Sequence, residues 1–196
     1  DATKQEALPG LAESWSVTPE GKTWTFKLRA GLHWSDGQPL TAADVVFTWN
    51  AVMYNPELNR LTYDVFRLDG KNFEVTQLDE QTVRVVTPEV FAPFLEFFGS
   101  VPVLPRHAME REVREGRFLS LYTPQTRPDR IVGSGPFRVK ASMPGQSVLL
   151  ERNPEFQGPG IRIALGFHFN GGVPLLIFTA DVAEPDKFVI RTYTCS

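Results

Sequence analysis

The chain has 196 residues, of which 42% are hydrophobic and 12% aromatic, and its formal net charge is −3. This size and composition allow a packed core for one domain or two small ones, and they exclude a wholly disordered chain. The pI near 5.7 provides no basic field for nucleic acid, so we expect no nucleic-acid partner. No apolar run approaches the roughly 20 residues that a membrane-spanning helix requires.

Residues 23–49 predict a strand followed by a tight turn and a helix. Apolar residues alternate with polar ones over 23–29, the period-two pattern of a half-buried strand; the apolar positions are Trp24, Phe26 and Leu28. Asp36-Gly37 tolerates the positive φ that a tight turn demands, and Pro39 stiffens the chain after it.

A capped helix is expected from Thr41 onward. The Thr41 side chain can accept a hydrogen bond from the N–H of Asp44, and the Asp44 carboxylate suits the positive end of the helix dipole. Val45, Trp49 and Val52 recur at helical spacing, so one face of this helix should face a core.

Residues 73–87 predict a hairpin of two strands around Asp79-Glu80-Gln81. After it, Thr87-Pro88 predicts the start of a short apolar helix that Pro93 interrupts. A second helix is expected over 106–115, where Pro105 precedes it and Gly116 ends it.

The C-terminal part returns to strands. Residues 135–141 and 147–153 predict a second hairpin, joined through Pro144-Gly145 in a type II turn. Strand-like runs follow at 161–169 and 175–179. The resulting order of strand, helix, hairpin, helices and hairpin is α+β, because it lacks the regular βαβ alternation of a doubly wound domain.

Six segments resemble, in order and spacing, landmarks of the extracytoplasmic solute-binding proteins of family 5, the peptide, dipeptide and nickel receptors of bacterial ABC importers. The resemblance spans about residues 8–156 and fades after Gln157. The six segments are LAESWSVTPEGKTWTFKLR, WSDGQPLTAADV, LDEQTVRVV, VPVLPRHAM, GSGPFRV and LLERNPEF.

The resemblance implies an α+β fold that is a partial first lobe of a two-lobed periplasmic-binding-protein-like architecture (class II, or cluster C), with a mixed sheet and an inserted α+β subdomain. It divides the chain into a first-lobe segment with the family signature (1–50), the inserted subdomain (51–132), a return to the first lobe (133–157) and a divergent, unassigned tail (158–196). Family members continue into a second lobe, so we interpret the chain as a fragment.

By the same resemblance, the expected function is solute binding, with an oligopeptide as the first choice of solute, for an ABC permease in the membrane. The expected protein is a periplasmic or extracellular membrane-associated monomer without cofactor. Two lobes of such a receptor close around the ligand by hinge motion. Without its second lobe the chain alone is expected to bind weakly or not at all, because half of the enclosing surface is absent.

Two tyrosines are the predicted ligand-binding residues. Tyr63 is the first choice and Tyr54 the second, since both follow the signature helix in a loop where the family contributes a cleft-facing aromatic residue. Loop positions suit recognition because a fixed scaffold holds a variable backbone. The four tryptophans are interpreted as core residues, with a ligand wall as the alternative; they are Trp15, Trp24, Trp34 and Trp49.

No catalytic or metal site is predicted. The histidines, at 33, 107 and 168, lack any metal-ligand spacing. Ser134 lies in GSGPF before a strand rather than in a nucleophile elbow, and the glycines beside it suggest a positive φ or a close backbone approach. The single cysteine, Cys195, is interpreted as an incidental terminal residue.

Two other interpretations stay open. Paired carboxylates could serve an extracytoplasmic carbohydrate-active hydrolase, which would require two of them to converge in a pocket, one with a raised pKa; the candidates are Glu13, Asp36, Asp44 and Glu151. The unmatched tail also allows a non-functional truncated product.

Overall fold

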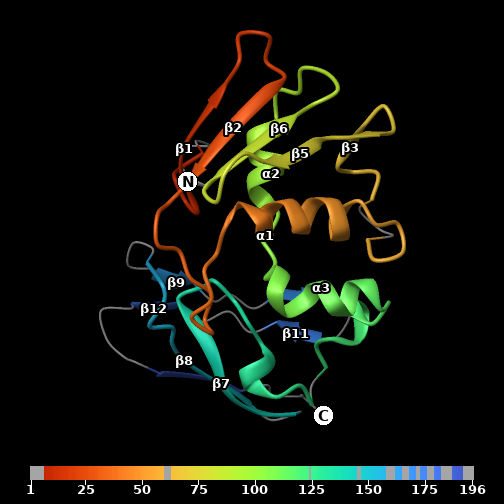
Figure 1. Cartoon of the computed structure of the whole chain (residues 1–196). Coiled ribbons are helices and arrows are strands. Elements are labelled where there is room, and N and C mark those ends of the chain that lie inside the picture. Colours follow the sequence, from red (N-terminus) through yellow and green to blue (C-terminus); the bar gives the residue numbers. More distant parts are fainter. Residues whose placement is uncertain are drawn as a thin grey trace. The chain divides into compact units, whose positions relative to one another are not determined.

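The computed structural model describes residues 7–59, 63–123, 125–144 and 147–157, and the backbone of five further strands between 162 and 191. The chain packs as two compact units (Figure 1). Unit 1 comprises residues 1–32 and 39–119, and unit 2 comprises residues 33–38 and 120–196. The four-part division expected from the family resemblance stays a prediction.

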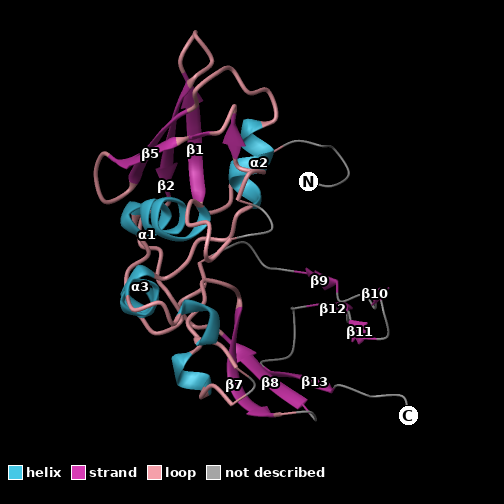
Figure 2. Cartoon of the chain, turned by 90° about the vertical axis from the view of Figure 1, so that its right-hand side faces the viewer, coloured by secondary structure: helices cyan, strands magenta, loops and turns pink. Residues whose placement is uncertain are grey.

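Unit 1 is built on a four-stranded antiparallel sheet with the order β1-β2-β6-β5, whose strands are labelled in Figure 1 and drawn in magenta in Figure 2. Its strands are β1 (Ala12–Val17), β2 (Thr23–Leu28), β5 (Glu74–Gln77) and β6 (Thr82–Val86). The predicted strand over 23–29 and the predicted hairpin over 73–87 are both confirmed. Phe26 and Leu28 are 6% and 4% exposed, so this face of β2 is the core face.

The signature helix is confirmed, with a change of helix type along it. Helix α1 (Ala42–Phe47) begins after Thr41, which forms a capping box with Asp44. It continues directly as a π-helix, η1 (Thr48–Met53), which the sequence pattern did not predict. Val45, Trp49 and Val52 are all buried, as the helical spacing predicted.

The next helix starts later than predicted. Helix α2 spans Phe94–Ser100, and Pro93 is its N-cap rather than an interruption. No helix follows Thr87 directly; its hydroxyl donates to the Glu89 carbonyl at 2.6 Å and lies 3.3 Å from the Lys22 carbonyl. Helix α2 completes an aromatic core, since the Phe98 ring stacks on Trp49 with centroids 4.8 Å apart.

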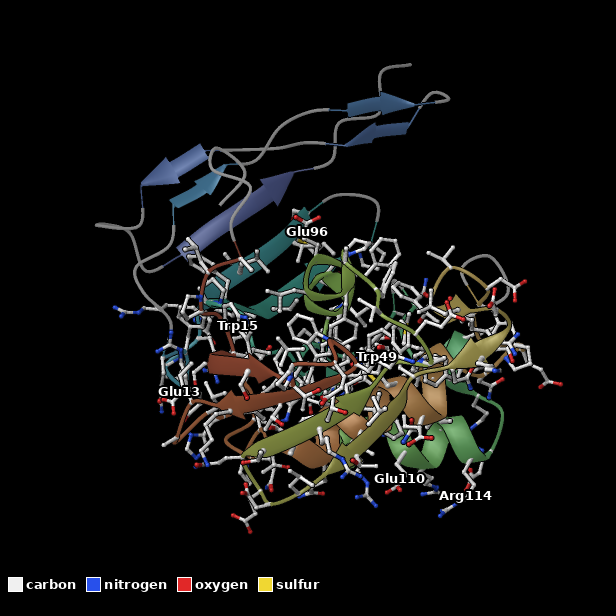
Figure 3. All side chains as sticks on the ribbon, turned by 90° about the horizontal axis from the view of Figure 1, so that it is seen from above. Glu13, Trp15, Trp49, Glu96, Glu110 and Arg114 are labelled. Atoms are coloured by element: carbon white, nitrogen blue, oxygen red, sulfur yellow. The ribbon has the colours of Figure 1, made fainter. Side chains whose placement is uncertain are left out.

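Helix α3 (Arg106–Arg114) confirms the predicted second helix, and Gly116 follows it with φ of 69°. Asp44 joins the starts of α1 and α3: one carboxylate oxygen accepts the Thr41 N–H and the other the Arg106 N–H, each at 2.9 Å. Figure 3 shows Trp49 inside the unit, whereas Glu110 and Arg114 of α3 project outward.

The turn of the family signature (residues 33–38), which we call the signature turn, belongs to unit 2. Trp34 donates its N–H to Gln38, and Gly37 has φ of 83°, so the predicted Asp36-Gly37 turn is confirmed. Ser35 exchanges hydrogen bonds with Gly133, donating its N–H at 2.8 Å and accepting on Oγ at 3.1 Å. Residues 33–38 therefore belong to unit 2, although the residues before and after them belong to unit 1.

A three-stranded antiparallel sheet with the order β13-β8-β7 organises unit 2. Its strands are β7 (Phe137–Met143), β8 (Ser147–Arg152) and β13 (Lys187–Arg191). The predicted hairpin is confirmed, although residues 145 and 146 of its turn lie outside the described residues. The short helices η2 (Phe118–Ser120) and η3 (Pro128–Arg130) precede this sheet.

Two interpretations from the sequence need correction: the role of the glycines beside Ser134, and the common core of the four tryptophans. Gly133 and Gly135 do not have positive φ, and a β-carbon at either would meet nothing closer than 4.0 Å. Their contribution is through the backbone, as the Gly135 carbonyl accepts the Asn153 side chain at 2.7 Å. Trp34 is buried but belongs to unit 2, so the four tryptophans do not form a single core.

The predicted strand runs beyond residue 160 overlap four short strands. Strand β9 (Arg162–Ala164) pairs with β12 (Thr179–Asp181), and β10 (His168–Asn170) pairs with β11 (Val173–Leu175). Residues 161, 165–167 and 176–178 of those runs lie outside the described residues. The fold is α+β as predicted, but every strand pair in the described part is antiparallel, so its sheets are not mixed.

Candidate functional site: a tyrosine loop built on the aromatic core

The predicted ligand-binding tyrosines lie on one connection of unit 1, which we call the tyrosine loop (residues 54–59 and 63–73). It leaves the end of η1 and returns to the sheet at β5 (Figure 1). Phe66, in the middle of the loop, packs edge-on against Trp49 with ring centroids 5.4 Å apart and an interplanar angle of 89°. The buried indole of the signature helix therefore fixes the loop to the core.

Tyr54 joins the two ends of the loop. Its hydroxyl accepts the backbone N–H of Phe73 at 3.0 Å, and its ring lies 5.6 Å from the Trp49 ring. Burial raises the pKa of Tyr54 well above its ordinary value, and the hydrogen bond from Phe73 opposes this only in part. The phenol is thus neutral and engaged in holding the loop; its role in ligand binding stays a prediction.

A tight hairpin shapes the second half of the loop. Strands β3 (Arg67–Leu68) and β4 (Lys71–Asn72) pair across Asp69 and Gly70, whose φ values are 48° and 70°. Two successive positive φ values at a two-residue connection are the signature of a type I′ turn, for which Asp-Gly is a preferred pair.

Arg67 uses its whole guanidinium within the loop. Nε donates to the Asn72 side chain at 3.1 Å, one terminal nitrogen pairs with Asp64 at 3.3 Å, and the other donates to the Gly70 carbonyl. The guanidinium carbon also lies 4.7 Å from the centroid of the Tyr63 ring, within the range of a cation–π interaction. The ring of Tyr63, the first-choice ligand residue, therefore packs against a guanidinium whose position is fixed by hydrogen bonds.

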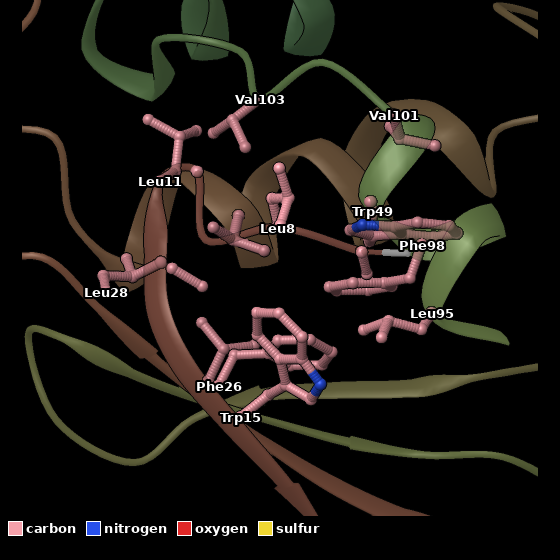
Figure 4. Close-up of a pocket in the computed structure, with 16 residues that line it drawn as sticks. Leu8, Leu11, Trp15, Phe26, Leu28, Trp49, Leu95, Phe98, Val101 and Val103 are labelled. Carbon is pink, nitrogen blue, oxygen red and sulfur yellow. The ribbon is translucent and has the colours of Figure 1, made fainter. Parts of the chain in front are cut away.

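An apolar pocket of about 200 Å³ lies elsewhere in unit 1 (Figure 4). Trp15 of β1 and Phe26 of β2 form one wall, Trp49 and Phe98 of the helices face them, and the N-terminal Leu8 lies among these side chains. None of the described residues that line it is charged. Trp15 therefore belongs to a pocket wall, whereas Trp49 is also a core residue.

The candidate carboxylates differ in their surroundings, and Glu13 lies exposed on β1. Asp44 is 4% exposed and holds two backbone N–H groups. Asp36 and Glu151 line one polar pocket of unit 2, of about 360 Å³. However, the ammonium of Lys140 and the guanidinium of Arg138, both bonded to Glu151, lower its pKa, which is opposite to what an acid catalyst requires.

The histidines lie on separate elements of the chain. His33 lies in the signature turn with a buried Nδ1 that has no hydrogen-bond partner, and His107 lies in α3. The side chain of His168 is outside the described residues. In the described part of the chain, no three His, Cys, Asp or Glu side chains gather as a metal site. Within the same part, no helix has both the length and the apolarity to cross a membrane.

Comparison with known proteins gives the family. The chain matches the bacterial extracellular solute-binding proteins, family 5 Middle, over residues 6–194. The chain belongs to this family. The periplasmic oligopeptide-binding protein OppA of Salmonella typhimurium is 31% identical over 163 residues, which are 76% of this chain and 28% of OppA.

Solved structures agree with this assignment. AppA from Clostridium difficile matches with a TM-score of 0.68 and 25% identity, over 93% of this chain and 32% of AppA. NikZ from Campylobacter jejuni, solved with Ni(L-His), matches with a TM-score of 0.63 and 26% identity, over 77% of this chain and 28% of NikZ. The chain spans about a quarter of the length of the curated relatives it matches.

Sequence reasoning proposed both tyrosines as ligand residues, which stays a prediction, and did not identify the residues that hold them in place. The sequence RLDGKN carries the Asp-Gly pair of a two-residue hairpin, and recognising it would have predicted that Arg67 and Asn72 face each other across the turn. The contact of Arg67 with Tyr63 had no comparable signal, because it depends on how the loop folds back.

Proposed function

We propose that the chain supplies one ligand-facing surface of a solute-binding receptor that delivers its solute to an ABC permease. Membership of the family supports the receptor function and a place outside the cytoplasmic membrane. The similarity to a periplasmic oligopeptide-binding protein supports oligopeptides as the solute class. The Ni(L-His) complex of NikZ makes a small metal chelate the second candidate.

The observation that carries the proposal is the construction of the tyrosine loop. Tyr63 is held by Arg67 on a hairpin that Phe66 and Tyr54 fix to the core. A tyrosine offers a large contact area with few rotatable bonds, so a fixed ring loses little entropy when a ligand packs on it. We assign the primary ligand contact to Tyr63 and a supporting position to Tyr54.

Recognition of a peptide backbone fits the rest of the proposal. Receptors that hold a peptide by its main chain tolerate varied side chains, whereas aromatic contacts fix its position. The net charge of −3 supports a protein without a nucleic-acid partner, and we propose that it acts as a monomer without catalysis.

Calorimetric titration of the full product of the gene that encodes this chain tests the proposal. Peptides of two to five residues should give saturable heat with a dissociation constant in the micromolar range or below. The Ni²⁺–histidine complex forms a second arm that identifies the alternative solute class. Lack of saturable heat in both arms would refute the proposed function. The 196-residue chain titrated by itself should bind much more weakly, since it presents one side of the enclosure.

A further inference from the structure

We propose that Arg67 is a specificity-determining residue: it holds Tyr63 in place and makes its ring accept uncharged groups of a ligand while disfavouring ammonium groups. This inference rests on the proposed ligand contact at Tyr63. Its starting point is the single guanidinium that combines the ring contact with three polar contacts inside the tyrosine loop.

The position of the Arg67 guanidinium is fixed from three directions. Asn72 lies on the paired strand β4, the Gly70 carbonyl lies in the turn, and Asp64 lies one residue beyond Tyr63. A planar guanidinium with its donors occupied has little freedom to rotate. The ring that packs on it is therefore ordered before any ligand arrives, which removes part of the entropic cost of binding.

The charge of Arg67 persists at the ring. Arginine stays protonated in proteins at all ordinary pH values. Its partner Asp64 lies 3.3 Å away but is 87% exposed at the side chain, so water screens part of the carboxylate's charge and the carboxylate offsets the guanidinium's field on Tyr63 only in part. The Arg67 side chain itself is only 24% exposed, which keeps its field toward the ring stronger than that of a fully solvated cation.

A ring that already has a cation on it is a poor site for a second one. The attraction between a cation and an aromatic ring comes from the ring's negative face, and like charges on the two sides of one ring repel each other. Peptide planes and aliphatic side chains carry no such penalty. The predicted class of ligand group at Tyr63 is therefore neutral and planar or apolar.

The test compares three proteins on a matched peptide panel. The full gene product is titrated with tri-alanine variants in which each position in turn carries lysine or the uncharged norleucine. In the wild type, one position should prefer norleucine. Arg67→Met keeps an unbranched apolar stem in place of the aliphatic part of arginine and removes the charge, and it should shift the lysine-to-norleucine affinity ratio at that position about two- to fivefold toward lysine. Arg67→Lys keeps the charge and should retain the wild-type ratio.

The ratio separates this role from a general structural one. A purely structural defect would weaken lysine and norleucine peptides alike and would leave every ratio unchanged. Tyrosine ring signals in NMR spectra supply a readout without ligand: the Tyr63 ring should flip faster in Arg67→Met than in the wild type. The inference would be overturned, with the proposed function unaffected, if Arg67→Met bound peptides with the wild-type lysine-to-norleucine ratio at all positions. The same holds if Arg67→Lys shifted the ratio as much as Arg67→Met. Failure of the wild type to bind any peptide would overturn both the inference and the assignment of oligopeptides as the solute class, and failure in the Ni²⁺–histidine arm as well would refute the proposed function.

Discussion

Removal of the Asp44 carboxylate is expected to destabilise unit 1 more than removal of any exposed charge. This carboxylate is 4% exposed and accepts the Thr41 and Arg106 N–H groups, each at 2.9 Å. It thus satisfies backbone donors at the first turns of both α1 and α3. A helix start without such an acceptor leaves backbone N–H groups unpaired.

The expected loss of stability follows from the two hydrogen bonds that the Asp44 carboxylate accepts. A hydrogen bond to a charged acceptor contributes about 1.5–3 kcal/mol, and relief of the desolvation of the buried carboxylate offsets part of the sum. We expect Asp44→Ala to lower the free energy of unfolding by about 3–4 kcal/mol. Asp44→Asn keeps one acceptor oxygen but turns an amide NH₂ toward the other donor, so we expect a loss of about 2 kcal/mol.

Urea denaturation followed by far-UV circular dichroism measures this loss. Glu110→Gln is the matched control: Glu110 lies in α3 and pairs with the Arg106 side chain at 3.0 Å, but both side chains are 49% exposed, so the cost should stay below about 0.5 kcal/mol. If Asp44→Ala costs no more than this control, the proposed link between the helix starts is wrong.

Two further variants test the turn and the base of the tyrosine loop. Gly37→Ala should lower the free energy of unfolding, measured by urea denaturation, by about 1–2 kcal/mol, because Gly37 has φ of 83° although the space around it is open. Gly133→Ala is the control and should be nearly neutral. Equal effects of the two variants would contradict the strain argument. Burial keeps the phenol of Tyr54 protonated in the folded state, while the unfolded chain ionises near its ordinary pKa of 10.0, so stability is full below that pH and falls above it. Tyr54→Phe should cost about 1 kcal/mol at pH 7 through the lost acceptor for Phe73 and should show a shallower loss above pH 10; an unchanged alkaline slope would refute the assignment.

The sequence patterns that predicted structure correctly were local ones. The capping box of Thr41 and Asp44 and the Asp36-Gly37 turn depend on residues a few positions apart, and the hairpin over 73–87 joins two strands that follow each other directly in the chain. Propensity and spacing within one short segment therefore determine them.

The features that sequence reasoning missed depend on distant partners. The signature turn joins unit 2 through Ser35 and Gly133, which are 98 positions apart. Helix α2 starts at Phe94 rather than after Thr87, whose hydroxyl is bonded to the carbonyl of Lys22, 65 positions earlier. No local pattern reports such bonds, because a threonine before a proline is equally suited to a cap and to a strand end.

The candidate site shows the same division. The family resemblance predicted Tyr63 and Tyr54 as residues of one loop, but not that Tyr54 holds the loop through Phe73. The Arg67 guanidinium reaches its partners through folding of the hairpin onto residues 63 and 64. Side-chain convergence of this kind follows from tertiary packing, which periodicity does not encode.

The most direct test of the central claim is the peptide affinity of the full gene product carrying Tyr63→Ala. A tyrosine that packs on the ligand should contribute a factor of at least about ten in dissociation constant, or about 1.4 kcal/mol. Tyr122→Ala is the matched control, since Tyr122 is a 43% exposed tyrosine of unit 2. We predict that affinity falls at least tenfold in Tyr63→Ala and stays within twofold in Tyr122→Ala. Equal affinities of the two variants would contradict the assignment of the tyrosine loop as the ligand-facing surface.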